Sequence, residues 1–311
     1  MDITWSQNCT NFKESNCTNL SGDSVHCSYI WLGVNLALVL PNFIGNTLVC
    51  LTIIKTKPLH NFCNFLLVNL AISDMVLGVL DLLSVVLALL SDNTSSMNVR
   101  LVAFCVVEVS IFTVTAISFE RYTAIVKPFQ RLGAANVGRL KIVIPVLWIL
   151  GIVFNIPSFI LFLDSTLDDH TAIDSHLDKN LASAKVDGVV HFLVCYVVPS
   201  LVMWVTYFKI VQALQRRSRV VGTNSSSSAL KAQKKVARLL GLVILSHNIF
   251  FLPFSVTSVL VMVFGLPNMS LFLDVFYYLQ FLSPIANPFI YWVHSQKFRN
   301  SFRDIIGPYS K

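Results

Sequence analysis

Three carboxylates interrupt long apolar stretches of the sequence. Asp74 and Asp81 lie in the stretch 62–90, and Glu108 lies in the stretch 99–126. Charged groups in hydrocarbon are costly, and those that occur are usually paired or functional. These three carboxylates are therefore where we expect the function to lie.

Hydrolytic chemistry at these acids is a poor fit. An intramembrane hydrolase needs a nucleophile paired with a base, or a metal cluster. Asp74 and Asp81 are seven residues apart on one expected helix, which separates them by about 10 Å. Since that distance is too large for both acids to hold one water molecule, we expect no catalytic residues and no enzyme activity.

The elements that must position these residues follow from composition. Of the 311 residues, 55% are hydrophobic and only 13% are charged, whereas soluble proteins are about one quarter charged. Lipid is therefore the expected solvent, and each apolar stretch must be a helix because lipid offers the backbone no hydrogen-bond partner. The fold class is an all-α membrane protein, a seven-transmembrane helix bundle. The expected spans are roughly 29–54, 62–90, 99–126, 140–163, 188–214, 236–265 and 270–293.

The basic residues predict how the chain is oriented. The segments between and after the spans at 55–61, 121–141, 209–238 and 297–311 hold 19 of the 23 Lys and Arg residues. By the positive-inside rule these segments are cytoplasmic, so the amino terminus is outside and the carboxyl terminus inside a plasma membrane. The net charge of +7 is then a topology signal with a contribution from membrane lipids. We expect no nucleic-acid partner.

Three regions are expected along the chain. They are an extracellular tail at 1–28, a membrane domain at 29–293, and an amphipathic cytoplasmic helix with a short tail at 294–311. Glycosylation motifs in the first region predict glycans at Asn8, Asn16 and Asn19. The same tail has three cysteines, so at most one internal disulfide forms there, and its pairing stays open.

Short motifs occur in order along the spans. They are Gly45-Asn46, Leu70-Ala71-Ile72-Ser73-Asp74, Glu120-Arg121-Tyr122, Trp148, Pro199 with Tyr207, Phe251-Leu252-Pro253, and Asn287-Pro288-Phe289-Ile290-Tyr291. Together they resemble the rhodopsin-like (class A) G protein-coupled receptors over residues from about 29 to 306. The resemblance implies a receptor that responds to an extracellular ligand and activates a heterotrimeric G protein.

The resemblance also implies a sodium ion near Asp74 that stabilises the inactive state. The positions that match the family's sodium site are Asn46, Asp74, Ser110, Ser283 and Asn287. The alternative is that Asp74 is only hydrogen-bonded or protonated. No further cofactor is expected, because the span 270–293 has no lysine to form a retinal Schiff base.

The resemblance also implies an activation switch, with Arg121 at the cytoplasmic end of its span. Arg121 resembles the family's arginine that leaves its acidic neighbour to engage the G protein and Tyr207, and Tyr291 resembles the tyrosine that swings inward. The residues assigned to activation are Glu120, Arg121, Tyr122, Tyr207, His247, Phe251, Pro253, Pro288 and Tyr291.

Some positions depart from the family pattern. Phe251 replaces the usual tryptophan, and His247 stands where a packing phenylalanine is expected, so pH-modulated signalling is a minority hypothesis. Ser96 replaces a cysteine that normally forms a disulfide with the second extracellular loop. The segment 229–238 has no acid to pair with Arg121, and we therefore expect elevated basal activity.

A ligand pocket is expected among polar and aromatic residues of several spans. Asp81 could reach Gln280 or a ligand cation, and Glu108 faces the fifth span with His191 as its natural partner. Whether Glu108 and His191 only fix packing or contact ligand stays open. The candidates are Asp81, Arg100, Glu108, His191, Tyr277 and Gln280. Such a mixed pocket does not discriminate a peptide from a small molecule.

Two other functions remain open at this point. One is a transporter or channel, although no inverted repeat or pair of broken helices is visible. The other is a receptor-like protein that binds a partner without coupling to a G protein.

Overall fold

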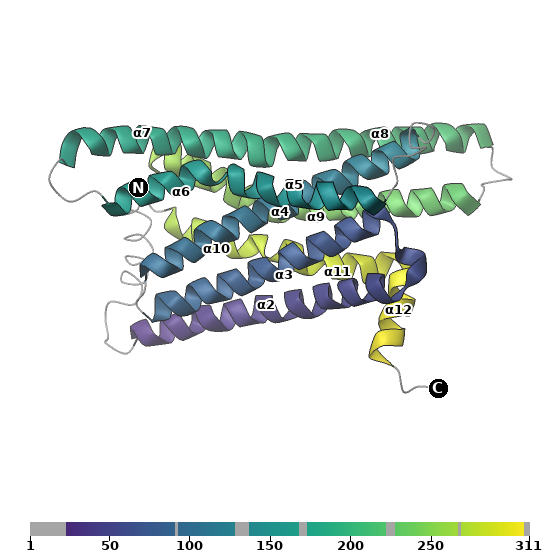
Figure 1. Ribbon diagram of the computed structural model, residues 1–311, viewed down its shortest axis with the longest axis horizontal. Helices are drawn as coiled ribbons and strands as arrows, with labels where there is room; N and C mark the ends of the chain where they lie inside the picture. Colours follow the sequence, from purple (N-terminus) through teal and green to yellow (C-terminus); the bar gives the residue numbers. More distant parts are fainter. Residues whose placement is uncertain are drawn as a thin grey trace.

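The structure, a computed structural model, describes residues 23–90, 93–127, 137–167, 173–221, 228–266 and 269–307. Helices account for nearly all of these residues, and most of them run along one common direction (Figure 1). In chain order they are α2 (Asp23–Lys55), the 3₁₀ turn η1 (Lys57–Leu59), α3 (Phe62–Leu89), α4 (Asn93–Val126), the 3₁₀ turn η3 (Val137–Arg139), α5 (Leu140–Val153), α6 (Ile156–Leu167), α7 (Ile173–His191), the π-helical segment η4 (Phe192–Val197), α8 (Val198–Val221), α9 (Ser228–Phe264), α10 (Ser270–Gln280), α11 (Leu282–His294) and α12 (Gln296–Ile306).

Several helices are long and apolar enough to cross a membrane. Within the described ranges there are six such segments: Leu32–Lys55, Phe62–Leu89, Ser95–Val126, Leu140–Leu163, Ala182–Arg219 and Ser228–Phe264. They coincide with the first six expected spans, so the all-α membrane architecture is confirmed. The helices run beyond the apolar residues, and α2 begins at Asp23, inside the segment expected to be a polar tail.

The segment expected as the seventh span is broken into two helices. α10 and α11 are separated at Phe281, and each alone is shorter than a membrane crossing. Pro284 explains the break, because proline has no N–H to bond the carbonyl of Gln280 one turn before it. Similarly, η4 comes just before Pro199, and the interruption between α5 and α6 comes just before Pro157.

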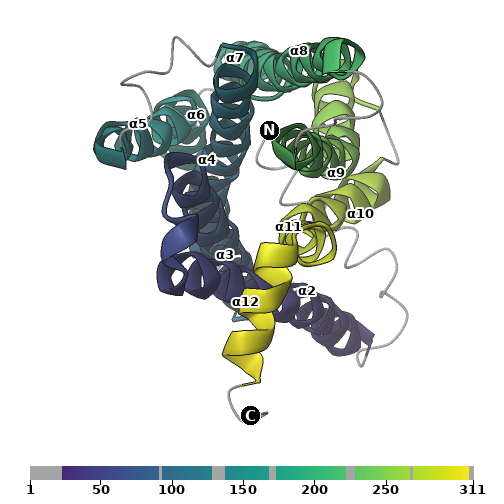
Figure 2. The ribbon, with the colours of Figure 1, turned by 90° about the vertical axis from the view of Figure 1, so that its right-hand side faces the viewer.

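Helix α4 occupies the centre of the bundle. It packs against α3, α5, α8 and α9 (Figure 2). Large apolar side chains on the outside, among them Ile44, Ile142 and Phe289, remain exposed, as expected for surfaces that face lipid.

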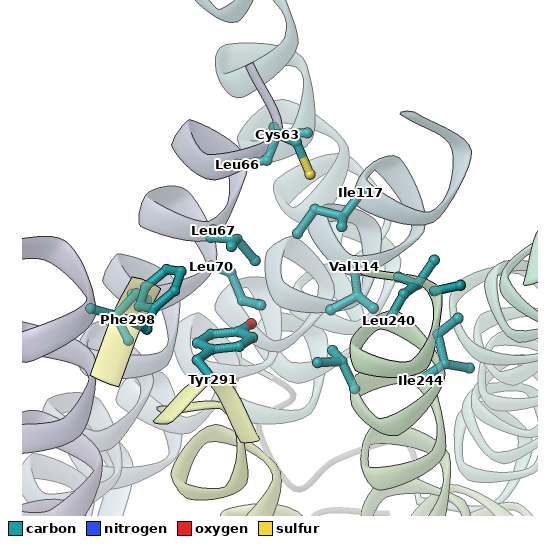
Figure 3. Close-up of a cluster of buried hydrophobic side chains, with 14 of the residues drawn as sticks. Cys63, Leu66, Leu67, Leu70, Val114, Ile117, Leu240, Ile244, Tyr291 and Phe298 are labelled. Atoms are coloured by element: carbon teal, nitrogen blue, oxygen red, sulfur yellow. The ribbon is translucent and has the colours of Figure 1, made fainter. Parts of the chain in front are cut away.

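A buried apolar cluster joins α3, α4, α9 and α11 near one end of the bundle. Tyr291 lies within it, close to Leu70 and Phe298, with its hydroxyl directed into the cluster (Figure 3). Phe298 and Phe302 bury one face of α12 against the bundle, while Lys297 and Arg303 are exposed on the other. α12 lies at a steep angle to the other helices (Figure 1).

Candidate functional site

Asp74 lies on α3 in the interior of the bundle, with only 1% of its surface exposed. The hydroxyl of Ser110 on α4 donates to its Oδ1 at 3.2 Å. The amide of Asn287 on α11 donates to its Oδ2 at 3.1 Å. One carboxylate therefore joins three helices, and it satisfies the requirement that a buried acid have polar partners.

A second layer of polar groups surrounds this carboxylate. Asn42 on α2 donates to the Asp74 backbone carbonyl at 2.7 Å. Asn46, one turn later, donates to the side chain of Asn42 at 2.7 Å and to the carbonyl of Pro284 at 3.2 Å. These bonds attach α2 to both α3 and α11. Ser283 is also buried, one turn before Asn287 on α11.

Sequence reasoning did not identify Asn42 as part of this network. The signal was available, because Asn42 and Asn46 are four residues apart and residues at that spacing are neighbours on a helix. The close approach of α2 to α11 was signalled by Gly45, since a Cβ there would lie 2.9 Å from Cγ of Pro288.

Three of the residues assigned to the activation switch lie at the end of the bundle that carries α12. Glu120, Arg121 and Tyr122 lie in the last two turns of α4 and are half-buried. The Tyr122 ring is flanked by the ammonium groups of Lys127 at 6.0 Å and Lys209 at 5.8 Å. Cationic groups are attracted to the face of an aromatic ring, so these contacts help to join α4 to α8.

Tyr207 on α8 packs closely against α9. A Cβ added to Gly241 would lie 2.6 Å from the Tyr207 hydroxyl and 2.7 Å from ring carbon Cζ. The absence of a side chain at Gly241 is therefore what lets the tyrosine approach this helix. The contact brings one switch residue against the sixth apolar helix.

Arg217 makes a second connection at the same end. Its Nη2 donates to the carbonyl of Ile125 on α4 at 2.8 Å, and its Nη1 donates to Oε1 of Gln233 on α9 at 3.2 Å. One guanidinium thus joins α8, α4 and α9. The sequence showed only a run of basic residues here, because nothing in the pattern distinguishes a bonded arginine from a solvated one.

His247 and Phe251 form a buried pair on α9. The His247 side chain is 3% exposed, and its ring stacks on Phe251 with centroids 4.4 Å apart. Its Nε2 has no hydrogen-bond partner in the part of the chain that the structure describes. Pro253 lies two residues further along the same helix.

The switch residues Pro288 and Tyr291 are buried on α11. Tyr291 packs on Phe298 with ring centroids 5.5 Å apart (Figure 3). Among the described residues its buried hydroxyl has no hydrogen-bond partner. A polar group held this way gains a hydrogen bond if the side chain moves to a wetter position.

Another buried acid, Asp81, lies two turns along α3 from Asp74 and belongs to a different cluster. The hydroxyl of Tyr277 on α10 donates to its Oδ1 at 2.7 Å. Arg100 on α4 lies 5.8 Å above the Tyr277 ring, and Phe254 on α9 packs edge-on against that ring at 5.7 Å. The sequence suggested that Asp81 could reach Gln280, but the donor to Asp81 is Tyr277. Gln280 is buried one turn further along α10.

Glu108 and His191 form the contact expected from the sequence. Nε2 of His191 lies 3.0 Å from Oε1 of Glu108, which joins α4 to the end of α7. Glu108 is 4% exposed, so this is an interior polar pair.

The remaining expectations concern the ends of the spans. Ser96 stands where the family usually has a disulfide-forming cysteine. Its hydroxyl donates to the carbonyl of Ser84 at 2.8 Å, and this hydrogen bond joins α4 to α3. Asn8, Asn16 and Asn19 lie outside the described residues, and their glycosylation stays a prediction.

Comparison with known proteins gives a matching family and several relatives that align with most of this chain. A family model described as 7 transmembrane receptor (rhodopsin family) matches residues 45–291. Human neuropeptide FF receptor 1 is 25% identical, in an alignment covering 96% of this chain and 76% of that protein. Human substance-K receptor is 28% identical, covering 97% and 79%, and human adenosine receptor A2a is 25% identical, covering 90% and 72%. The matched range contains both Asp74 and Arg121.

Proposed function

The chain belongs to the rhodopsin family of seven-transmembrane receptors, and we propose that it couples an extracellular ligand to heterotrimeric G protein activation. This is a family of receptors and not of enzymes. The observation that carries the proposal is the network in which Ser110 and Asn287 both bond Asp74. That network joins three helices, so a change in its hydrogen bonds changes how those helices pack.

The topology proposed for this function has seven crossings with the amino terminus outside. α10 and α11 together run from residue 270 to 294, which is long enough to cross the bilayer as one kinked span. α12 would then lie on the cytoplasmic surface, where its exposed Lys297 and Arg303 meet lipid headgroups. The four basic segments favour this orientation, because the helix ends next to them lie at the α12 end of the bundle (Figure 1).

A sodium ion beside Asp74 is the proposed allosteric ligand. The carboxylate of Asp74, the hydroxyls of Ser110 and Ser283 and the side-chain oxygen of Asn287 are the hard ligands that such a cation needs. Asn46 holds the second layer through its bond to Pro284. Bound in the resting arrangement, the ion would favour that arrangement over any in which α11 moves.

Activation is proposed to move α9 away from α4 and α8. Two contacts described above oppose that motion, namely Tyr207 against Gly241 and the Arg217 bond to Gln233. Breaking them would expose Arg121 at the end of α4 for contact with the G protein. His247, Phe251 and Tyr291 are buried on the helices that would move, which is why we assign them to the switch.

The ligand is proposed to bind around the Asp81 cluster. Asp81, Arg100, Tyr277 and Gln280 come from three helices, α3, α4 and α10, so a ligand there could bias how these helices pack. Relatives named for a neuropeptide and for adenosine leave both a peptide and a small molecule as candidates. We also assign Glu108 and His191 to ligand binding, but only as a pair that supports the Asp81 cluster.

The proposal is tested by a ligand screen in cells that express the receptor. Peptides, amines and lipids are applied while activation of several G protein families is recorded. A ligand that activates the wild type and fails on an equally expressed Arg121→Ala variant supports the proposal. Ligands that bind without activating any G protein would instead indicate a receptor-like binding protein, and uptake of a labelled solute by proteoliposomes would indicate a transporter.

A further inference from the structure

Three side chains with metal-binding atoms meet between α4 and the junction of α7 with η4. Glu108, His191 and Cys195 each offer one ligand atom, and these atoms all lie within 4.8 Å of one another. Cys195 is a buried free thiol. The cluster is separate from the network around Asp74 and from the cluster around Asp81.

The backbone holds two of these groups together. His191 ends α7, and Cys195 lies four residues later within the π-helical segment η4, so both side chains project toward the same neighbour. Pro199 keeps this segment irregular, because it cannot donate to the carbonyl of Cys195. π-Helical insertions of this kind occur frequently at functional sites.

The polar atoms of the cluster are incompletely satisfied. Oε1 of Glu108 contacts His191, but its buried Oε2 has no hydrogen-bond partner within the described ranges. A buried carboxylate oxygen without a partner is costly. Glu108 is 96% buried, since 4% is exposed, so solvent does not satisfy this oxygen.

A tetrahedral metal could draw the three ligand atoms together, since they all lie within 4.8 Å of one another. Zinc binds histidine nitrogen and carboxylate oxygen at about 2.0–2.2 Å and cysteine sulfur at about 2.3 Å. Tetrahedral ligands at those lengths are roughly 3.3–3.6 Å apart. The 3.0 Å separation of His191 Nε2 and Glu108 Oε1 needs to widen by only a few tenths of an ångström to admit the ion.

We propose that Glu108, His191 and Cys195 form a site for zinc or a similar divalent transition metal. A thiolate and an imidazole select such metals, whereas calcium and magnesium prefer oxygen ligands alone. Three protein ligands leave a fourth position for water or for a group of a ligand.

The proposed site goes beyond the receptor function and does not depend on it. Binding deprotonates the thiol and replaces the hydrogen bond between Glu108 and His191 with bonds to one ion. The metal would tie α4 to the fifth apolar helix, and any ion that binds only the folded protein raises its stability. Both effects can be measured on the unliganded receptor.

The test is zinc binding to purified, metal-free, full-length receptor in detergent. Competition with a fluorescent chelator gives the stoichiometry and the dissociation constant, and a thermal melt gives the stabilisation. We expect Cys195→Ser to bind one equivalent of zinc fewer, or to bind zinc at least tenfold more weakly. The zinc-dependent rise in Tm should also be lost. Glu108→Gln should show the same loss.

The matched control is Cys63→Ser, which removes another buried thiol, on α3. It should bind zinc like the wild type, and so separates this site from other thiols and from the cysteine-containing tail. If Glu108→Gln does not fold, Cys195→Ser decides alone, because serine is close to cysteine in size. Equal zinc binding by Cys195→Ser and wild type, or no zinc binding by the wild type, would overturn the proposal.

Discussion

Asp74 shows how a single residue can report on the packing of several helices. Its two carboxylate oxygens accept hydrogen bonds from α4 and α11, while its backbone carbonyl accepts one from α2. Any arrangement in which one of these helices shifts must leave a polar atom unpaired or admit water or an ion. This is the physical basis for assigning Asp74 to control of the receptor.

The proposed sodium site predicts salt-specific stability. We expect the wild-type receptor to melt a few degrees higher in sodium chloride than in choline chloride at equal ionic strength. An ion present at ten times its dissociation constant adds about 1.4 kcal/mol to the stability. Asp74→Asn should abolish this difference. Asp81→Asn, the same substitution two turns away on α3, should retain it, and loss of the difference in both variants would contradict the assignment.

A second residue-scale prediction concerns Gly241. Gly241→Ala should destabilise the receptor by about 1–3 kcal/mol, the usual cost of overpacking, because the new Cβ would lie 2.6–2.8 Å from the hydroxyl and ring carbons of Tyr207. The Tm of purified variants measures this effect. Tyr207→Ala in the same chain should remove most of the penalty contributed by Gly241→Ala. Additive effects of the two substitutions would show that the clash does not occur.

At the residue scale, sequence reasoning succeeded where family motifs or helix geometry fixed the neighbours. The Asp74 contacts with Ser110 and Asn287 and the contact of Glu108 with His191 belong to this group. Tyr277 could not be identified as the donor to Asp81, because sequence does not give the rotation of α10 relative to α3.

At the scale of elements, one arginine connects α4, α8 and α9, the helices that we propose separate on activation. Arg217 holds the ends of these helices through a carbonyl and a neutral glutamine. A bond to a neutral acceptor is weaker than one to a carboxylate. Elevated basal activity stays a prediction, and Arg217 makes a connection to α9 that the sequence did not reveal.

Substitutions at Gln233 should change basal signalling in both directions. Gln233→Ala should raise G protein activation without ligand about two- to fivefold, since a bond partly open to solvent contributes about 0.5–1 kcal/mol. Gln233→Glu should lower it by creating a charge-assisted bond to Arg217. The exposed Lys235→Ala serves as the control. Equal signalling at equal surface expression in the two Gln233 variants would exclude this role for the link.

The sequence located the helices better than it located their ends. The six long spans were located from hydropathy, but α2 and α7 begin well before their apolar residues. The prolines indicated kinks, yet whether each gives a π segment, as before Pro199, or a break, as before Pro284, depends on the neighbouring helices. Helix starts and proline kinks both depend on packing between helices, which a local sequence pattern does not specify.

At the scale of the whole molecule, apolar and basic residues occupy different parts of the surface. Exposed apolar side chains cover the outside of the long helices, while α2 and α8 carry Lys55 and Arg219 in their last turns, and both helices end on the side of the bundle that carries α12 (Figure 1). The polar clusters are inside, on α3, α4 and α11. A bundle of this kind senses one side of a membrane and reports to the other only if its interior contacts can rearrange.

The most direct measurement is nucleotide exchange by purified heterotrimeric G proteins on receptor reconstituted in lipid nanodiscs, without ligand. We expect wild-type receptor to accelerate exchange on at least one G protein family above the rate with empty nanodiscs. Arg121→Ala, equally folded by its thermal melt, should not accelerate it. Exchange no faster than with empty nanodiscs for every family, or equal exchange by wild type and Arg121→Ala, would contradict the proposed coupling.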